Sequence, residues 1–344
     1  MIKQTFLLEK DGQDLFFYDF VNKNGSTLRV TNYGATITSI KTKNKHGELT
    51  ESVLGFDSIE PYLAGHPFLG STAGRFANRI KAGKFSINGK TYQAPLSEGN
   101  NMLHGGNVGF DKRIFTGEID GDTLKLSYFS PDGEEGFPGN LEFSVSFTLT
   151  NDDAVEITYR AKSDADTLLN PTNHSYFNLT GGVVSAMGHL LTIHADTITE
   201  TDAELIPTGE FLDVHNTPCD FLAPHAIGER QANRDYQPMV MSGGYDHNFC
   251  MFSSERKLAA EVYEPTSGRH MDVVTDRPSI QLYDSHALPT GHIGHNGVPI
   301  KPLDGFCLET QVDPDAPNHE KFAQALLKAG EEFVSTTVYK FYAD

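Results

Sequence analysis

The feature that most constrains this chain is the alternation of apolar and polar residues along many short segments. Over residues 143–150, phenylalanine, valine and leucine alternate with serine and threonine. Successive side chains of a β-strand point to opposite faces, so this segment predicts a strand with one buried face. The same period occurs at 124–128, 155–159 and 333–342, where β-favouring residues are frequent. The pattern predicts strands along the whole chain.

Pairs of asparagine or aspartate with glycine separate many of these segments. They begin at Asp11, Asn24, Asn88, Asp120 and Asp304. Such pairs favour the tight turns of β-hairpins, because both residues readily adopt positive φ. We therefore expect many strands to pair antiparallel with their neighbours in sequence.

Helical patterns are scarce. One short helix is predicted over Ser58–Leu63, with Ser58 as its N-cap, and another over His319–Lys328, ended by Gly330. Neither is long enough to build an α/β fold. No internal repeat or linker interrupts the chain, so we predict a single all-β domain over residues 1–344. An antiparallel sandwich would bind its ligand on one sheet or at the loops of one end.

The charge balance narrows the range of partners. The chain has 27 lysine and arginine residues against 46 aspartate and glutamate residues, a formal net charge of −19. Such a field repels nucleic acid, anionic membranes and polyphosphate. A neutral or cationic partner is the better match, although charge of this size also simply keeps a protein in solution.

The cysteines and the N-terminal residues indicate the cellular compartment. Cys219, Cys250 and Cys307 are far apart and odd in number, which argues against a disulfide framework. The segment MIKQTFLLEKDG lacks the apolar stretch of a signal peptide, and eighteen apolar residues never occur in a row. We expect a cytoplasmic protein in a reducing compartment.

Two motifs suggest chemistry that their context does not support. The segment GKFSINGKT at 83–91 resembles a phosphate-binding loop, but five residues rather than four separate its glycines, and Asn88-Gly89 predicts a hairpin. The letters HIGH at 292–295 occur in one class of tRNA synthetase, here without the required nucleotide-binding pattern. As metal ligands these histidines lack a third partner, so we expect a mobile loop with solvated histidines and no metal site.

The segment NPTNHSYFNL at 170–179 concentrates amide, hydroxyl, imidazole and aromatic groups. Its histidine, His174, has neighbours that can fix its tautomer and adjust its pKa, as an acid-base catalyst requires. A hydrogen-bonded structural histidine explains the residue types equally well. Both readings stay open on these residues alone.

The segment FCLE at 306–309 places the carboxylate of Glu309 at the end of an apolar run. Burying a carboxylate is costly unless it is hydrogen-bonded or used, and an apolar setting raises its pKa towards that of a useful general base. The alternative is a glutamate at a strand end that simply reaches water.

Other motifs supply planar polar groups suited to binding hydroxyls. The segment GRFANRI at 74–80 contributes arginine and asparagine, LHGG at 103–106 contributes histidine beside two glycines, and the segments GYDHNF and SIQLY contribute an aspartate and a glutamine. The candidates are Arg75, Asn78, Arg79, His104, Asp246 and Gln281.

Taken together, these motifs resemble those of the aldose 1-epimerases, also called galactose mutarotases, in the family's own order. The resemblance covers about residue 28 to the C-terminus and rests on STAGRFANRIKAGKFSINGK, NMLHGG, GFDKR, DGEEGFPGN, NPTNHSYFNL, GYDHNF and FCLETQVDPDAPN. It implies a β-supersandwich, no cofactor, no metal, and a free hexose as the substrate of a monomer or homodimer.

The resemblance also implies roles for individual residues. It makes His174 the general acid and Glu309 the general base in the interconversion of α and β anomers. The implied sugar contacts are Asn78, Arg79, His104, Tyr176, Asp246 and Gln281. Arg75 either contacts sugar or supports Arg79. The stretch YDSHA at 283–287 departs from the family's Tyr-Thr/Ser-Gly-Asn-Phe pattern, so the preferred hexose and the cavity edge at 284–296 are left open.

Three rival functions remain at this point. A hexose-6-phosphate epimerase would need additional cationic residues for phosphate, which the acidic balance disfavours. A noncatalytic sugar-binding module would not need both His174 and Glu309. A glycoside hydrolase would need Asp246 and Glu309 as a carboxylate pair at a defined separation.

Overall fold

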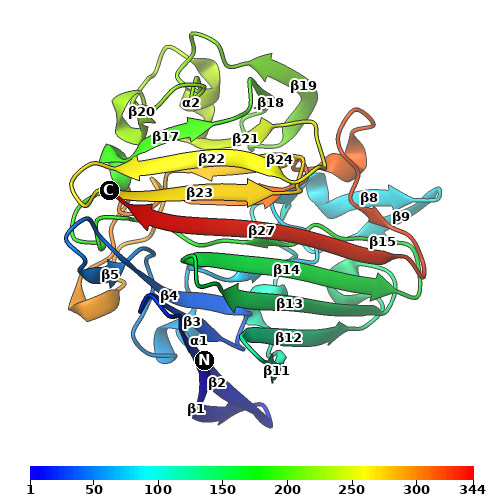
Figure 1. The fold of residues 1–344 in the computed structure, drawn as a ribbon. Coiled ribbons are helices and arrows are strands. Elements are labelled where there is room, and N and C mark those ends of the chain that lie inside the picture. The colour runs from blue at the N-terminus through cyan, green and yellow to red at the C-terminus, as the bar shows by residue number, and fades with distance from the viewer.

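The structure, a computed structural model, describes residues 1–344. It contains 27 strands and only two short α-helices, which confirms the predicted all-β class. The strands form seven sheets, in which all paired strands are antiparallel neighbours. Figure 1 shows the largest sheet facing the viewer, with the long C-terminal strand β27 (Glu332–Ala343) across its middle.

The largest sheet has nine strands. In spatial order they are β11 (Thr116–Asp120), β12 (Thr123–Ser130), β13 (Leu141–Leu149), β14 (Ala154–Ser163), β27, β23 (Arg269–Thr275), β22 (Lys257–Glu264), β17 (Leu190–Ile193) and β20 (His225–Ala226). The segments predicted from alternation at 124–128, 143–149, 155–159 and 333–342 lie within β12, β13, β14 and β27, so these predictions are confirmed.

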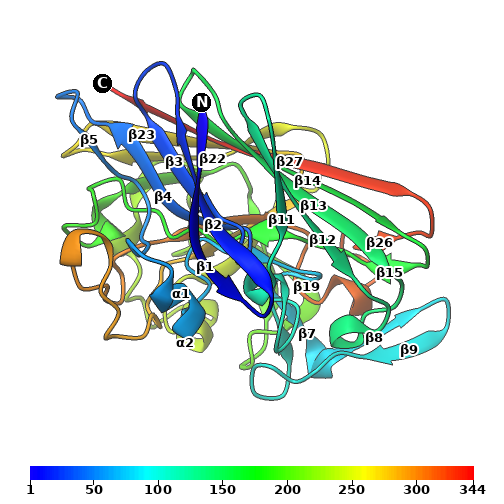
Figure 2. The ribbon, with the colours of Figure 1, turned by 90° about the horizontal axis from the view of Figure 1, so that it is seen from below.

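Two five-stranded sheets complete the main layers, and Figure 2 shows the N-terminal one in blue beside strands β11 to β14 of the largest sheet. The N-terminal sheet consists of β1 (Ile2–Lys10), β2 (Gln13–Val21), β3 (Thr27–Thr31), β4 (Thr36–Lys43) and β5 (Leu49–Glu51). The other consists of β19 (Pro207–Asp213), β18 (Thr197–Thr201), β21 (Asp246–Cys250), β24 (Ser279–Tyr283) and β25 (Cys307–Gln311). We call this second one the site sheet.

Four two-stranded ladders fix the connecting loops. They pair β10 (Met102–Leu103) with β7 (Arg79–Ile80), β15 (Thr167–Leu168) with β26 (Leu326–Leu327), β16 (Thr172–Asn173) with β6 (Thr72–Ala73), and β8 (Lys84–Ile87) with β9 (Lys90–Gln93). Asn88 and Gly89 join β8 to β9 with φ of 51° and 77°, the positive values of a tight hairpin turn. The GKFSINGKT segment is therefore a hairpin, as predicted, and not a phosphate-binding loop.

A core of 48 buried residues joins the nine-stranded sheet to both five-stranded sheets. Alternate residues of β13 and β14, such as Val145 and Ile157, belong to it, and so do Phe249, Ile280 and Leu308 of the site sheet. Burial of each such side chain contributes roughly 1.5–3 kcal/mol, so the core needs no disulfide. One face of the site sheet is thus fixed by packing, and its other face is left for the cavity described below.

The helix predictions were partly right. Helix α1 (Glu60–Ala64) overlaps the expected Ser58–Leu63, although Ser58 does not cap it. The expected helix at His319–Lys328 is wrong, because only Ala316–Asn318 forms a short turn and β26 follows. The Gln324 amide donates to the main-chain oxygens of His319 and Phe322, which a helix would need for its own amides.

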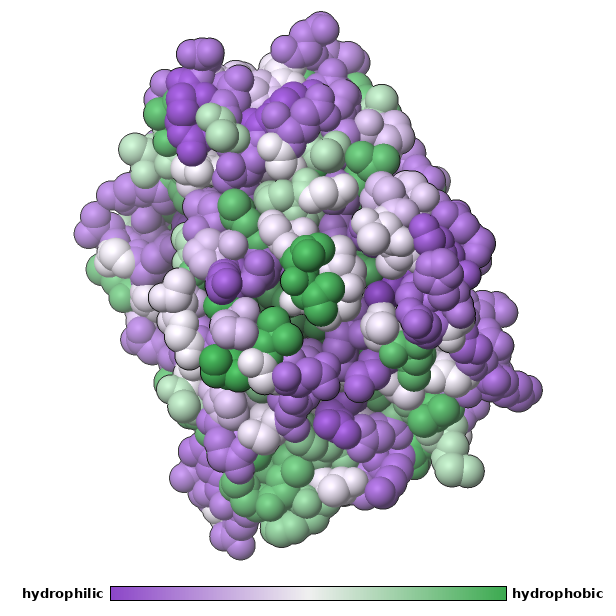
Figure 3. Space-filling view, turned by 90° about the vertical axis from the view of Figure 1, so that its left-hand side faces the viewer, coloured by the Kyte–Doolittle hydropathy of each residue, from purple (hydrophilic) through white to green (hydrophobic).

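A second helix, α2 (Gln237–Ser242), was not predicted. Neither helix is long and apolar enough to cross a membrane. The face of the molecule in Figure 3 is mostly hydrophilic, with hydrophobic side chains in separate groups between polar ones. This mixed surface agrees with the low apolar content and large net charge of the sequence.

Candidate active site

A cavity of about 410 Å³ opens on the face of the site sheet that is turned away from the core. Seven of the eight predicted site residues line it, although they come from distant parts of the sequence. They are Asn78, Arg79, His104, His174, Tyr176, Asp246 and Glu309. The eighth, Gln281, is 3% exposed and lies behind this wall.

Strand register explains why the sheet residues meet. Asp246 of β21 pairs with Tyr283 of β24, which in turn pairs with Cys307 of β25. Two residues further along these strands, Gln281 of β24 pairs with Glu309 of β25. Because side chains alternate along a strand, these residues share the face of the sheet on which the cavity lies, while their neighbours enter the core. The Gln281 amide donates to the Asp246 carboxylate at 2.6 Å, so it holds that carboxylate rather than forming the wall.

The segment that carries His174 is fixed by its own polar groups. The side-chain oxygen Oδ1 of Asn170 accepts hydrogen bonds from Arg277 and from the main-chain N–H of Val312. The amide of Asn173 donates to Gly70, and the main chain of His174 exchanges bonds with Ser71 and Gly70. The amides that suggested a site in the sequence therefore anchor the segment, and only its histidine and tyrosine reach the cavity.

His174 and Glu309 form a buried pair. Nε2 of His174 lies 3.6 Å from Oε1 of Glu309, and the side chains are 5% and 2% exposed. Burial lowers the pKa of His174 to about 4, against smaller opposite effects of its own main chain and Asp246. Burial also raises the pKa of Glu309 well above 4.5, helped by Asp246 and opposed by Arg79.

Glu309 has a second unusual feature. Its Oε2 is buried and has no hydrogen-bond partner in the protein. A buried carboxylate oxygen without a donor is costly, and a sugar hydroxyl would satisfy it. The sequence-based reading that Glu309 merely reaches water is therefore wrong, since this side chain is enclosed.

His104 has a defined donor role. The main-chain N–H of Asn78 donates to its Nδ1 at 3.2 Å, and burial lowers the pKa of His104 well below 6.5. The neutral ring then carries its proton on Nε2, so the free nitrogen is a donor.

This tautomer also bears on metal binding. His104, His174 and Glu309 place one possible ligand atom each within 4.8 Å of one another. A metal needs the lone pair of His104 Nε2, which would force the Nδ1 proton against the Asn78 N–H. The donor set therefore does not suit a cation.

Arg79 is the cation of the cavity. Its guanidinium makes two hydrogen bonds to Glu98, at 2.6 and 2.9 Å, and one to Asp246 at 3.5 Å. Although burial opposes it, the charge of Asp246 and the bonds to Glu98 raise the pKa of Arg79. The positive charge is balanced by these two carboxylates, so the cavity presents little free charge to an anion.

Arg75 has a different role from Arg79 in the same motif. It is buried and donates to Ser130 and to the main chain of Pro138 and Gly139. It does not line the cavity, and none of its hydrogen bonds goes to Arg79. Its bonds hold the 130–139 segment, and support of Arg79 through packing stays a prediction.

The histidines at 292–295 do not form the solvated loop that we expected. Nδ1 of His295 bonds Asp57 at 2.8 Å, and its side chain is only 10% exposed. The ring of His292 packs 5.6 Å from Phe56. These contacts tie the loop to the segment that follows β5, so the expectation of solvated histidines is wrong for His295.

Comparisons with known proteins agree with this site. A family profile described as Aldose 1-epimerase matches residues 17–340. The chain belongs to the aldose 1-epimerase family. As a member of it, the protein is an isomerase. It is 41% identical to galactose mutarotase of Bos taurus over 91% of this chain and 90% of that one. It is 35% identical to aldose 1-epimerase of Escherichia coli K12 over the full length of both.

Solved structures of aldose epimerases share the fold. The galactose 1-epimerase of Lactobacillus acidophilus superposes with a TM-score of 0.85 at 30% identity, covering 100% of this chain and 99% of that one. The GalM/aldose epimerase homologue of C. elegans gives 0.87 at 26% identity, with 99% of both chains covered. The β-supersandwich implied by the sequence motifs is thereby confirmed.

The structure adds cavity residues that the sequence did not single out. Phe68 lies 4.6 Å from the ring of His104 and 5.8 Å from that of His174, between ring centroids, and its φ is 56°. Glu98 binds Arg79, and Cys307 contacts His174. Cys307 stands two residues before Glu309, so strand alternation in FCLE could have revealed it, whereas no sequence signal marks Phe68 or Glu98.

The stretch that departs from the family pattern forms part of the cavity rim. His286 and Ala287 both line it. Asp284, fully buried, holds His286 through Nδ1 at 2.5 Å and accepts the main-chain N–H of Tyr245. The residues that differ from the expected asparagine and phenylalanine are therefore ones that a sugar can meet.

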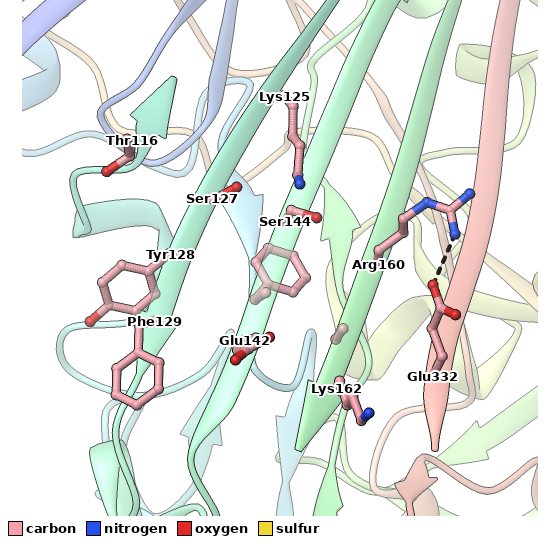
Figure 4. A pocket seen from close by; sticks show the side chains of 12 residues that line it. Thr116, Lys125, Ser127, Tyr128, Phe129, Glu142, Ser144, Arg160, Lys162 and Glu332 are labelled. Carbon is pink, nitrogen blue, oxygen red and sulfur yellow. Dashed lines mark hydrogen bonds and ion pairs between the residues drawn. The ribbon is translucent and has the colours of Figure 1, made fainter. Parts of the chain in front are cut away.

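A larger hollow, of about 620 Å³, lies on the outer face of the nine-stranded sheet (Figure 4). We call it the outer hollow. Figure 4 shows its lysine, arginine and glutamate side chains spread over several strands, with one ion pair between Arg160 and Glu332 at 3.0 Å. None of the predicted site residues lines it. Size alone therefore does not identify the site in this epimerase.

Proposed function

We propose that the protein interconverts the α and β anomers of free hexoses, with His174 as general acid and Glu309 as general base. The observation that carries this assignment is the enclosed pair itself, 3.6 Å apart at the cavity wall, with one buried Glu309 oxygen that has no hydrogen-bond partner. An acid and a base held together are what opening a hemiacetal requires. Family membership supports the same reaction.

The reaction balances with groups of this chain alone. Glu309 takes the proton of the C1 hydroxyl while Nε2 of His174 gives its proton to the ring oxygen, and the bond between C1 and that oxygen breaks. Rotation about C1–C2 turns the free aldehyde. The ring oxygen then attacks the other face of C1, the proton returns to His174, and Glu309 reprotonates the new hydroxyl.

The pKa shifts set the starting state. They favour the uncharged forms of both groups, in which the pair holds one proton and that proton resides on Glu309. Moving it to His174 gives the carboxylate and imidazolium that ring opening needs. Sugar hydroxyls that hydrogen-bond to the carboxylate favour this arrangement.

Arg79, Asp246 and His104 serve to hold the sugar. His104 offers its Nε2–H, Asp246 offers carboxylate oxygens, and Arg79 offers a charge-assisted donor. Asn78 supports the histidine through its main chain, Gln281 supports Asp246, and Tyr176 donates its hydroxyl to Pro67. Hydrogen bonds to several hydroxyls hold the open-chain sugar in place during the rotation about C1–C2.

The rival functions fit the cavity less well. A phosphorylated hexose finds one arginine there, already balanced by Glu98 and Asp246. A hydrolase would need Asp246 as acid, base or nucleophile, yet Arg79 and Gln281 occupy that carboxylate. A simple binding module gains nothing from burying His174 against Glu309 at the cost of desolvation.

Location and assembly belong to the same proposal. The three cysteines are free and buried, which suits a reducing compartment such as the cytoplasm. We keep a single domain over 1–344, no cofactor, and a monomer or homodimer as parts of it. The altered rim at His286 and Ala287 supports a hexose preference distinct from that of relatives with asparagine and phenylalanine there.

Polarimetry tests the function. Freshly dissolved α-D-galactose and α-D-glucose should reach equilibrium faster with purified protein than in buffer alone. Glucose 6-phosphate should be accelerated much less. Acceleration of only the phosphorylated sugar would favour the first rival, and none on any sugar would favour the binding module.

A further inference from the structure

Cys307 lies directly behind the catalytic histidine. It starts strand β25, and because side chains alternate along a strand, it points to the same face as Glu309 two residues later. Its Sγ is 3.5 Å from Nδ1 of His174, and the residue is completely buried. One strand therefore places both the base and a partner for the acid.

The thiol is a neutral partner. Burial, together with the charge of Glu309, raises the pKa of Cys307 well above 9, so the sulfur keeps its proton. A thiol can donate through S–H and can also accept weakly at sulfur. It can thus face Nδ1 whether or not that nitrogen carries a proton.

No other group occupies this side of the ring as a side-chain hydrogen-bond partner. Phe68 and Tyr176 contact His174 through their ring faces and edges, and Glu309 faces Nε2. The ring also hydrogen-bonds its own main-chain oxygen, an acceptor that likewise favours a proton on Nδ1. That oxygen accepts the N–H of Gly70 at 3.0 Å with its other lone pair.

We propose that Cys307 is a positioning residue for His174: its Sγ accepts from Nδ1–H and keeps the neutral ring unprotonated on Nε2. This inference rests on the proposed acid role of His174. In this tautomer the lone pair of Nε2 faces Glu309, so Nε2 can take the proton that Glu309 holds and give it to the ring oxygen of the sugar. Nδ1 keeps its proton, and the thiol stays its acceptor, in both states of the ring.

The choice of a thiol has a chemical consequence. A carboxylate beside Nδ1, as in a serine hydrolase triad, stabilises the imidazolium and holds the proton on the ring. A neutral thiol fixes the orientation without that stabilisation. His174 then remains a strong acid that releases its proton readily to the sugar.

The first test is the tautomer itself. Nitrogen NMR of protein with ¹⁵N-labelled histidine distinguishes the two ring nitrogens, and the signals of His174 are those lost in His174→Gln. At neutral pH the wild type should show a protonated Nδ1 and an unprotonated Nε2. Cys307→Ala should give a mixture of tautomers. An unprotonated Nδ1 in the wild type would overturn the proposal.

The second test separates positioning from packing. Cys307→Val keeps a small apolar side chain without a hydrogen-bonding group, and Cys307→Ser keeps a neutral acceptor. We expect kcat to fall roughly tenfold in the alanine and valine variants, in the range of supporting hydrogen-bond partners, with KM within about twofold. Serine should recover most of the rate. Equal rates for valine and wild type would contradict the role.

Cys219→Ala is the matched control, because Cys219 is equally buried but lies in the main core and has no side-chain bond to His174. Melting temperatures of all variants separate loss of fold from loss of rate. If His174→Gln keeps full activity, the proposed function fails whatever the tautomer. If His174→Gln is inactive and Cys307→Val is not, only this inference fails.

Discussion

The cavity of the site sheet and the outer hollow contain the same kinds of charged residues but differ in burial. In the outer hollow, Arg160 and Glu332 pair at 3.0 Å while 54% and 63% exposed. In the cavity, Arg79 and Asp246 are 11% and 14% exposed, and His174 and Glu309 are 5% and 2% exposed. Exposed pairs contribute about 0–1 kcal/mol, whereas buried ones carry a desolvation cost. Of these two hollows, the cavity is therefore the one that keeps charged and titratable groups buried at a cost.

The largest effect expected from this comparison is on the buried pair. His174→Ala and Glu309→Ala should each lower kcat roughly 10²–10⁴-fold, because each removes one proton-transfer group. Polarimetry measures the rate, and circular dichroism checks that the fold survives. Either variant at near wild-type rate would remove its residue from the mechanism.

The pH profile of kcat/KM should have two limits, because the His174–Glu309 pair is active only while it holds one proton. The rate should fall as pH drops through about 4, where His174 takes a second proton and the carboxylate is no longer available as base. It should also fall at high pH, once the raised pKa of Glu309 is passed and the pair has lost its proton. Beyond each limit the rate should change about tenfold per pH unit. A flat profile across both limits is the contrary result.

Removing the cavity cation should weaken sugar binding. Arg79→Ala deletes a donor to Asp246 and to the sugar, and hydrogen bonds to charged groups are worth about 1.5–3 kcal/mol. We expect KM for galactose to rise about tenfold or more. Arg75→Ala, by contrast, should lower the melting temperature, because Arg75 holds the 130–139 loop. An unchanged KM in Arg79→Ala would show that Arg79 does not contact sugar.

The smallest effect is expected in the outer hollow. Glu332→Gln removes the charge of an exposed pair, so stability should change by less than about 1 kcal/mol and kcat and KM should stay within error. Thermal unfolding and polarimetry measure both. A clear loss of activity would mean that the outer hollow communicates with the cavity and that burial does not separate the two regions.

Sequence reasoning succeeded where local pattern decides structure. Alternation located β12, β13, β14 and β27, and Asn88-Gly89 located a hairpin, because strand period and turn geometry are local properties. It failed at 319–328, where the Gln324 side chain competes for main-chain oxygens and β26 pairs with β15, 160 residues earlier. Such long-range pairing leaves no mark in a short window.

The site was predicted unevenly for a related reason. His174 lies in a segment of many polar residues and Glu309 at the end of an apolar run. The family resemblance assigned their roles. Arg75 and Arg79 occur in one motif, yet one binds a distant loop and the other faces the cavity. Only the fold determines which arginine reaches the cavity, since the ladder between β7 and β10 places Arg79 there. Phe68 and Glu98 reach the cavity by loop geometry that no local pattern encodes.

The central claim is that burial of the His174–Glu309 pair, rather than the presence of charge, makes the catalytic site. The most direct measurement compares the initial rates of α-D-galactose mutarotation for wild type, Glu309→Gln and Glu332→Gln by polarimetry under identical conditions. We predict that Glu309→Gln falls to near the buffer rate while Glu332→Gln matches wild type. Comparable rates for the two variants would contradict the account.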